Sequence, residues 1–192
     1  MDVLAGGDGE TRFTPVRRIK LRPSLSFSPG DMFLFRAPQP TYLATAWPGE
    51  LCVLGSSVCL ALERSGGAST VALFCHGTSS DLGMARRSLD TLRERLDCHV
   101  VAVEYPGYAK AGEDNRMWRS LLNEAVRSVY LYLTGPMGWS ADRIVVIGRS
   151  LGSGPASRLA REFQPGALIL LAPFSSVKDI AGAIVGDTLA NV

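Results

Sequence analysis

Short apolar runs alternate with segments of helical periodicity through most of the chain. Four runs have strand length and few polar residues, at Thr70–Cys75, Cys98–Val103, Arg143–Ile147 and Ala167–Leu171. Runs of this kind are typical of strands buried on both faces of a sheet, because neither face needs polar side chains. The pattern therefore predicts a buried sheet that helices cover.

Helical segments lie between these runs. Leucines recur at three- and four-residue spacing within Met84–Leu96, which predicts an amphipathic helix. A second helix is predicted over Met117–Leu133, with a stop signal at Gly135, and a third over Ala156–Phe163. Strands that alternate with helices predict the α/β class: a mostly parallel sheet with helices on both faces.

The N-terminal part of the chain has a different character. Residues 1–40 are rich in Gly, Pro, Ser and Arg without a sustained period, which predicts a flexible or irregular leader. Thr41–Ala46 and Ser57–Glu63 read as two short strands that enter the sheet in a hairpin-like arrangement. We expect one α/β domain over residues 41–192.

Amino-acid composition and net charge indicate which kinds of binding partner to expect. The 192 residues are 46% hydrophobic and 20% charged, with a net charge of +2, which indicates one soluble domain and no nucleic-acid partner. Basic residues nevertheless gather near the N-terminus, at Arg17, Arg18, Lys20 and Arg22. This basic cluster is either a solvated tail or a weak contact with anionic membrane.

Cysteine usage favours a reducing compartment. Cys52, Cys59, Cys75 and Cys98 lie in or beside apolar runs at irregular spacing, and no Cys-x-x-Cys pair occurs. This pattern is typical of buried thiols in a cytoplasmic protein rather than of a disulfide framework or a zinc site. We expect no metal and no organic cofactor, and we find no signal peptide or membrane-spanning run in the sequence.

The pentapeptide from Gly148 to Gly152 carries the strongest chemical signal. It reads Gly-Arg-Ser-Leu-Gly and lies between a predicted strand and a predicted helix. Gly-x-Ser-x-Gly in this context is a nucleophile elbow, in which Ser150 occupies a strained turn and the glycines admit close neighbours. Ser150 is therefore the candidate nucleophile, and it needs a base to remove its proton.

The loop after the run that ends at Cys75 is the natural partner of this elbow. It begins with His76-Gly77, and a loop at this place supplies one backbone N–H of an oxyanion hole. The donors in this sequence are Thr78, in the loop, and Leu151, directly after the nucleophile. His76 is expected to brace the loop by hydrogen bonding rather than to act as the base, and His99 is expected to be structural.

The glycine spacing also suits a second class of protein. Gly148, Gly152 and Gly154 follow a strand, as in dehydrogenases whose backbone approaches a pyrophosphate. That motif belongs at the first strand, whereas this one comes late in the chain. The sequence also lacks the Tyr-x-x-x-Lys of short-chain dehydrogenases, so a hydrolase is favoured.

Three motifs in order resemble one family. Cys75–Gly83 is similar to the loop His-Gly-Asn-x-x-Asp-Leu-Gly of α/β-hydrolases, in the branch of protein depalmitoylases and lipase-like serine hydrolases. Val103–Tyr108 matches their stretch Asp-Tyr-x-Gly-Tyr-Gly, and Leu170–Phe174 resembles the end of their next strand. The resemblance covers about residues 41–180, and it implies Ser150 as nucleophile with the oxyanion donors named above.

The resemblance also implies an acid and a histidine after the last recognised strand. The two histidines of this sequence, His76 and His99, both precede Ser150, and the chain ends at Val192. We therefore expect a partial domain without its last strands and an incomplete triad; Asp179 is the weaker alternative for the acid. The function expected is hydrolysis of an ester, thioester or amide, in a small-molecule or acyl-protein substrate. The alternative is a catalytically inactive short form that binds an acyl group or a protein.

Overall fold

The computed structural model describes residues 41, 50–54, 57–62, 67–106, 108 and 119–176. The predicted leader, the basic cluster within it, most of the predicted strand at 41–46, and Asp179 lie outside these residues. Thr41 itself is described and does not belong to a strand.

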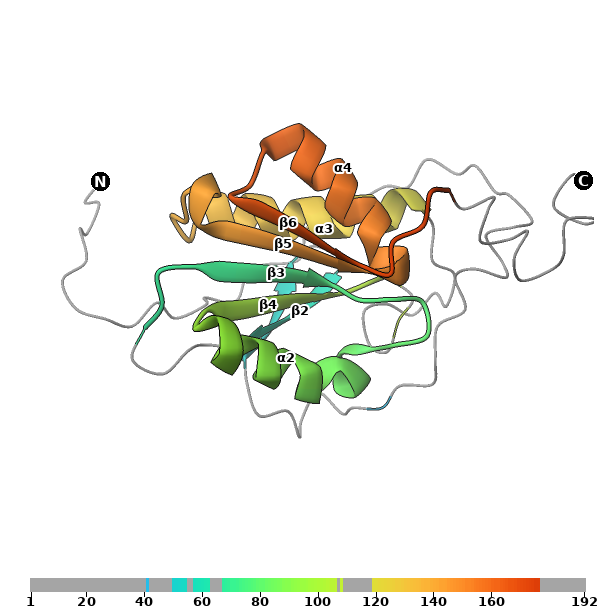
Figure 1. Ribbon diagram of the computed structural model, residues 1–192, viewed down its shortest axis with the longest axis horizontal. Coiled ribbons are helices and arrows are strands. Elements are labelled where there is room, and N and C mark those ends of the chain that lie inside the picture. The colour runs from blue at the N-terminus through green and yellow to red at the C-terminus, as the bar shows by residue number, and fades with distance from the viewer. Residues whose placement is uncertain are drawn as a thin grey trace, which may run out of the picture.

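The described strands form one six-stranded sheet in the order β1-β2-β4-β3-β5-β6. They are β1 (Glu50–Leu54), β2 (Ser57–Leu62), β3 (Val71–Cys75), β4 (His99–Glu104), β5 (Ile144–Arg149) and β6 (Ala167–Leu171). The last four run parallel, as the sequence predicted, and β1 and β2 add an antiparallel hairpin at one edge. Because β3 and β5 are parallel neighbours, the loops that follow them leave the same end of the sheet (Figure 1).

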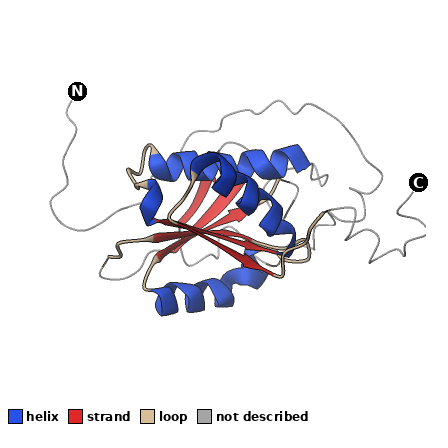
Figure 2. Ribbon diagram, turned by 45° about the horizontal axis from the view of Figure 1, so that its top comes forward, coloured by secondary structure: helices blue, strands red, loops and turns tan. Residues whose placement is uncertain are grey.

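Helices cover both faces of the sheet. α2 (Leu82–Leu96) lies on one face, whereas α3 (Arg119–Thr134) and α4 (Ser153–Phe163) lie on the other (Figures 1 and 2). α2 begins where the side chain of Asp81 accepts a hydrogen bond from the backbone N–H of Met84, an N-cap that satisfies one of the free amides of the first turn. This three-layer arrangement confirms the predicted α/β class.

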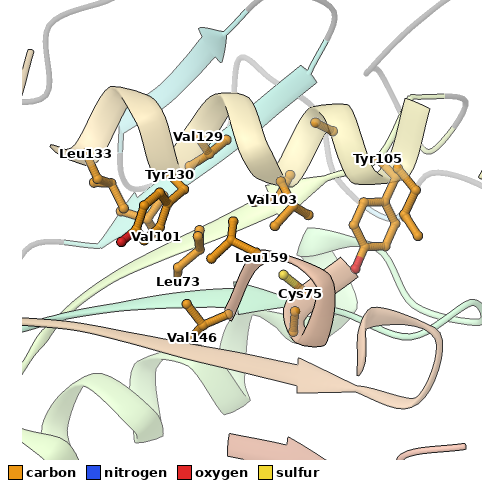
Figure 3. Close-up of a cluster of buried hydrophobic side chains, with 14 of the residues drawn as sticks. Leu73, Cys75, Val101, Val103, Tyr105, Val129, Tyr130, Leu133, Val146 and Leu159 are labelled. Carbon is orange, nitrogen blue, oxygen red and sulfur yellow. The ribbon is translucent and has the colours of Figure 1, made fainter. Parts of the chain in front are cut away.

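The sheet separates two buried clusters. The larger joins alternate residues of β3, β4 and β5, such as Leu73, Val101 and Val146, to α3 and α4 (Figure 3). The smaller joins the intervening residues, such as Phe74 and Ile147, to α2. Successive strand residues point to opposite faces, so a continuous apolar run supplies both clusters.

The hairpin at the sheet edge corrects one prediction. The strand that pairs with β2 is Glu50–Leu54, not Thr41–Ala46. Pairing of Leu54 with Ser57 leaves only Gly55-Ser56 to connect the strands, and this dipeptide is a recognised hairpin signal. The apolar run from Glu50 to Leu62 is therefore two strands, of which the sequence analysis found the second.

Candidate active site

Ser150 lies at the end of the parallel strand β5 in a strained backbone conformation. Its φ angle is +48°, in the left-handed region that non-glycine residues seldom occupy. A single 3-10 turn, Ser150–Gly152, leads from β5 directly into α4. Such strain persists only where the surroundings impose it, and a serine in this state between strand and helix is the geometry of a nucleophile elbow.

The two glycines of the motif are required by close packing. A methyl group on Gly148 would lie 2.6 Å from Cβ of Ala156 in α4. A methyl group on Gly152 would lie 2.2 Å from the carbonyl oxygen of Cys75, at the end of β3. Carbon atoms do not approach this closely without displacement of the backbone, so both glycines allow the turn to sit against its neighbours.

Ser153 fixes the elbow from the helix side. Its hydroxyl donates a hydrogen bond of 2.6 Å to the carbonyl oxygen of Ser150. Ser153 itself is buried, and the bond is partly buried, which limits competition from water. The turn that presents Ser150 is thus held by contacts to β3, to α4 and within itself.

The loop after β3 meets this elbow. A methyl group on Gly77 would lie 3.3 Å from Cβ of Ser150 and 3.9 Å from its Oγ. Gly77 therefore lies close enough to Ser150 that a methyl group on it would touch the serine, and Thr78 follows Gly77 in the chain. Leu151, the other predicted donor, is buried within the elbow turn. The structure brings together the two segments that carry the predicted donors, and the direction of their N–H groups stays a prediction.

His76 is engaged on both ring nitrogens. Its Nε2 lies 2.8 Å from Oε1 of Glu104, and its Nδ1 lies 2.8 Å from the carbonyl oxygen of Gly77. A carbonyl oxygen only accepts, so Nδ1 carries a proton there. With Nε2 occupied by a buried carboxylate, neither nitrogen is open to the hydroxyl of Ser150, in agreement with a bracing rather than a basic role.

Two tyrosines after β4 complete this bracing, and the sequence analysis had not assigned them. Tyr105 donates from its hydroxyl to the carbonyl oxygen of His76, and Tyr108 donates to that of Thr78, each at 2.8 Å. Burial raises the pKa of Tyr108 to about 12 and holds the pKa of Tyr105 well above its usual range, so both remain protonated donors. The sequence signal for these tyrosines was the stretch Val103–Tyr108, which had been recognised as a family motif without a role being assigned to its side chains.

Asp81 is a second unassigned residue of this loop. It is fully buried, and its carboxylate accepts hydrogen bonds from the backbone N–H and the hydroxyl of Thr41 in addition to the N–H of Met84. The bonds from Thr41 measure 2.7 and 2.6 Å. One carboxylate thus caps α2 and holds a residue far away in the sequence.

His99 lies at the opposite end of the sheet. It begins β4, whereas Ser150 follows the C-terminal end of the parallel strand β5. Its ring packs edge-on against Trp139 with centroids 5.6 Å apart, and burial lowers its pKa. This environment favours the neutral ring and agrees with a structural role.

Two other kinds of feature are absent from the described residues. Those residues include no group of three or more His, Cys, Asp or Glu side chains placed to hold a metal ion. The same residues include no helix with the length and apolar character of a membrane span.

Comparison with known proteins shows the family. The model of the alpha/beta hydrolase family matches residues 72–190, more than half of the chain. Alpha/beta hydrolase domain-containing protein 17B of Homo sapiens is 27% identical over 124 residues, which cover 64% of this chain and 42% of that protein. Alpha/beta hydrolase domain-containing protein aho-3 of Caenorhabditis elegans is 25% identical over 207 residues, which cover 92% of this chain and 60% of that protein.

Solved structures agree with the fold. An alpha-beta hydrolase from Vibrio vulnificus superposes with a TM-score of 0.58 at 18% identity, covering 73% of this chain and 53% of that one. A hormone-sensitive lipase from a metagenome library gives a TM-score of 0.53 at 23% identity, covering 76% of this chain and 49% of that one. The chain thus spans about half the length of the proteins that it matches.

The strained serine at the end of β5, the loop of β3 packed against it and the family match over residues 72–190 all point the same way. The chain belongs to the alpha/beta hydrolase family.

Proposed function

We propose that this chain carries the nucleophile and the oxyanion hole of a serine hydrolase. The observation that supports this most directly is the +48° φ angle of Ser150, at the junction of β5 and α4 and close to Gly77. Strain of this kind exposes a nucleophile and is common at functional sites.

In the proposed reaction, Oγ of Ser150 attacks the carbonyl carbon of an ester, thioester or amide while a base takes the hydroxyl proton. The carbonyl oxygen becomes an oxyanion, which the backbone N–H groups of Thr78 and Leu151 stabilise. The base returns its proton to the leaving group, so the intermediate expels an alcohol, thiol or amine and leaves an acyl group on Ser150. Water then attacks this acyl-enzyme and releases the acid.

We propose that the base and its acid come from sequence beyond these 192 residues. His76 is engaged on both nitrogens, and His99 begins β4 at the far end of the sheet. Relatives of which this chain covers 42% and 60% leave room for both groups. On this proposal the chain by itself is a partial hydrolase with an incomplete triad.

The substrate class that we propose is an acyl ester or an acyl thioester. The support is the resemblance of Cys75–Gly83 and Val103–Tyr108 to the corresponding loops of protein depalmitoylases and lipase-like hydrolases. The basic cluster at Arg17–Arg22 suits a protein that meets its acylated substrate at an anionic membrane surface.

A fluorophosphonate probe tests this proposal. We expect slow but specific phosphonylation of Ser150 in the purified chain, and none in Ser150→Ala, with the modified peptide identified by mass spectrometry. Loss of triad members leaves about 10³–10⁴-fold acceleration over water in a known protease, so weak reactivity should persist. A form extended by the downstream reading frame should react much faster.

The matched control is Ser157→Ala, at an exposed position of α4. Ser153→Ala is not suitable, because Ser153 bonds to Ser150.

Two results would contradict the proposal. If phosphonylation were equal in the wild-type chain and Ser150→Ala, Ser150 would not be the nucleophile. An extended form that remained inert while binding acyl chains would favour the inactive binding module instead.

A further inference from the structure

The carboxylate of Glu104 contacts both ends of the loop that faces Ser150. Its Oε1 lies 2.8 Å from Nε2 of His76, the first residue after β3. Its Oε2 accepts a hydrogen bond of 2.9 Å from the backbone N–H of Leu82, the first residue of α2. Between these two points the chain runs through Gly77 and Thr78, so one side chain closes the whole loop at its base.

The sheet register explains why Glu104 can do this. Cys75 pairs with Val103 in the parallel pairing of β3 with β4, so His76 and Glu104 follow as neighbours at the ends of their strands. Both lie on the face that α2 covers, because they continue the alternation of Phe74 and Ala102, which pack in the α2 cluster. The start of α2 therefore sits directly over the carboxylate.

The environment makes this contact strong. Glu104 and His76 are 0% and 1% exposed, so water does not compete for the carboxylate. The N–H of Leu82 belongs to the first turn of a helix, where amides lack intrahelical partners and the helix dipole favours negative charge. A buried carboxylate without such partners would be strongly destabilising, so the pairing holds the loop and the charge together.

We propose that Glu104 is a positioning residue for the oxyanion hole, acting as a clamp that fixes both ends of the His76–Leu82 loop. This inference rests on the proposed function only for its catalytic consequence. Tyr105 and Tyr108 hold carbonyl oxygens within the loop, whereas the carboxylate of Glu104 joins the start of the loop to its end. The clamp presets the direction of the Thr78 amide before any substrate binds.

Two conservative variants of Glu104 distinguish the effect of side-chain length from the effect of its negative charge. Glu104→Asp keeps the charge but is shorter by one carbon–carbon bond, about 1.5 Å, so it contacts only one end of the loop. Glu104→Gln keeps the length: its amide nitrogen donates to Nε2 of His76 and its oxygen accepts from Leu82. The clamp therefore fails in the aspartate variant and survives in the glutamine variant.

The hydrogen-exchange rate of the Leu82 amide measures whether the clamp is formed, and this measurement requires no reaction at Ser150. We expect exchange in Glu104→Asp to be about tenfold faster than in wild type, as for loss of one hydrogen bond to a charged group. Glu104→Gln should restore most of the protection. Equal exchange in wild type and both variants would overturn the proposal, as would equal acceleration in both.

The rate at which the fluorophosphonate probe phosphonylates Ser150 measures the effect of the clamp on catalysis. It should slow in Glu104→Asp by about tenfold, more than in Glu104→Gln, at a temperature where thermal melting shows both variants folded. Slowing without accelerated Leu82 exchange would overturn the clamp. Absence of labelling in the wild type would instead refute the proposed function, since the exchange measurement stands apart from it.

Tyr108→Phe is a third variant and serves as the control. It removes the hydroxyl that bonds to the carbonyl oxygen of Thr78 and leaves both contacts of Glu104 in place. We expect its Leu82 amide to exchange as in wild type. Acceleration as large as that predicted for Glu104→Asp would show that the loop ends are not held by Glu104, and would overturn the proposal even if the aspartate variant did not fold.

Discussion

Strands β3 and β6 have equally apolar sequences but very different environments. Val71–Cys75 lies between β4 and β5, and its residues are between 0% and 7% exposed. Ala167–Leu171 pairs with β5 alone among the described strands, and Leu168, Ile169 and Leu171 are 39%, 38% and 45% exposed. An apolar sequence therefore allows a strand to be buried on both faces. Whether it is buried depends on the strands and helices that pack beside it.

The same difference has chemical consequences. At the end of β3, burial raises the pKa of the Cys75 thiol to about 12, so the thiol stays protonated and inert. At β6, the exposed aliphatic side chains lie on a strand that has a neighbour on one side only among the described strands. Edge strands normally carry charges, prolines or bulges that prevent pairing with other chains, and the sequence Ala-Leu-Ile-Leu-Leu has none of these residues.

Truncation of one leucine in each strand gives the largest contrast. Leu73→Ala removes a side chain that is fully buried in the cluster between the sheet and helices α3 and α4, and it should lower the free energy of unfolding by about 2–5 kcal/mol. Leu168→Ala, at a partly exposed position of β6, should lower it by less than about 1 kcal/mol. Urea unfolding followed by circular dichroism measures both. Equal losses would contradict the difference in burial that the structure shows.

Two glycines of the elbow region extend the comparison. Gly152 faces the end of β3, where a methyl group would lie 2.2 Å from the carbonyl oxygen of Cys75, so Gly152→Ala should cost about 1–3 kcal/mol and slow phosphonylation of Ser150. Gly154 lies in α4 and faces the segment after β6, where a methyl group would be no closer than 3.8 Å to Phe174. Gly154→Ala should stabilise the protein by about 0.5–1 kcal/mol through helix propensity. A stable, reactive Gly152→Ala protein would contradict the close packing of the elbow against β3.

The edge of β6 that pairs with no described strand predicts self-association with little effect on stability. We expect the wild-type chain to form oligomers at micromolar concentration, and Ile169→Lys to be monomeric, because an edge lysine opposes strand pairing. The free energy of unfolding should change by less than about 0.5 kcal/mol, as for an exposed position. Light scattering across a concentration series measures the mass. A monomeric wild-type chain would show that this edge is protected.

Much of the architecture followed from local pattern. The strand Ala167–Leu171 was predicted with its exact ends, and the elbow at Ser150 was identified from its glycines and its place between strand and helix. Both signals are local: a continuous apolar run and a turn that only small residues permit. The strand Glu50–Leu54 was missed because its apolar run continues into β2 and only Gly55-Ser56 marks the division.

The bracing of the site was not predictable in this way. In the sequence, Glu104 was only one letter of the motif Val103–Tyr108, and Asp81 only one of the loop Cys75–Gly83. Their further contacts, to His76 and to Thr41, depend on which strands are neighbours and on where the chain returns. Such hydrogen bonds cannot be predicted from local sequence patterns, because they join residues that are far apart in the chain and meet only after the sheet has formed.

The sequence by itself determined the class of the fold, the strained serine and the glycines that make room for it, since propensity and steric exclusion act over a few residues. Only the tertiary structure decided which of two apolar strands is buried, that both nitrogens of His76 are engaged, and that one carboxylate spans the loop facing Ser150. The physical reason is that burial and hydrogen-bond pairing belong to the neighbours in space, which the order of strands in the sheet selects.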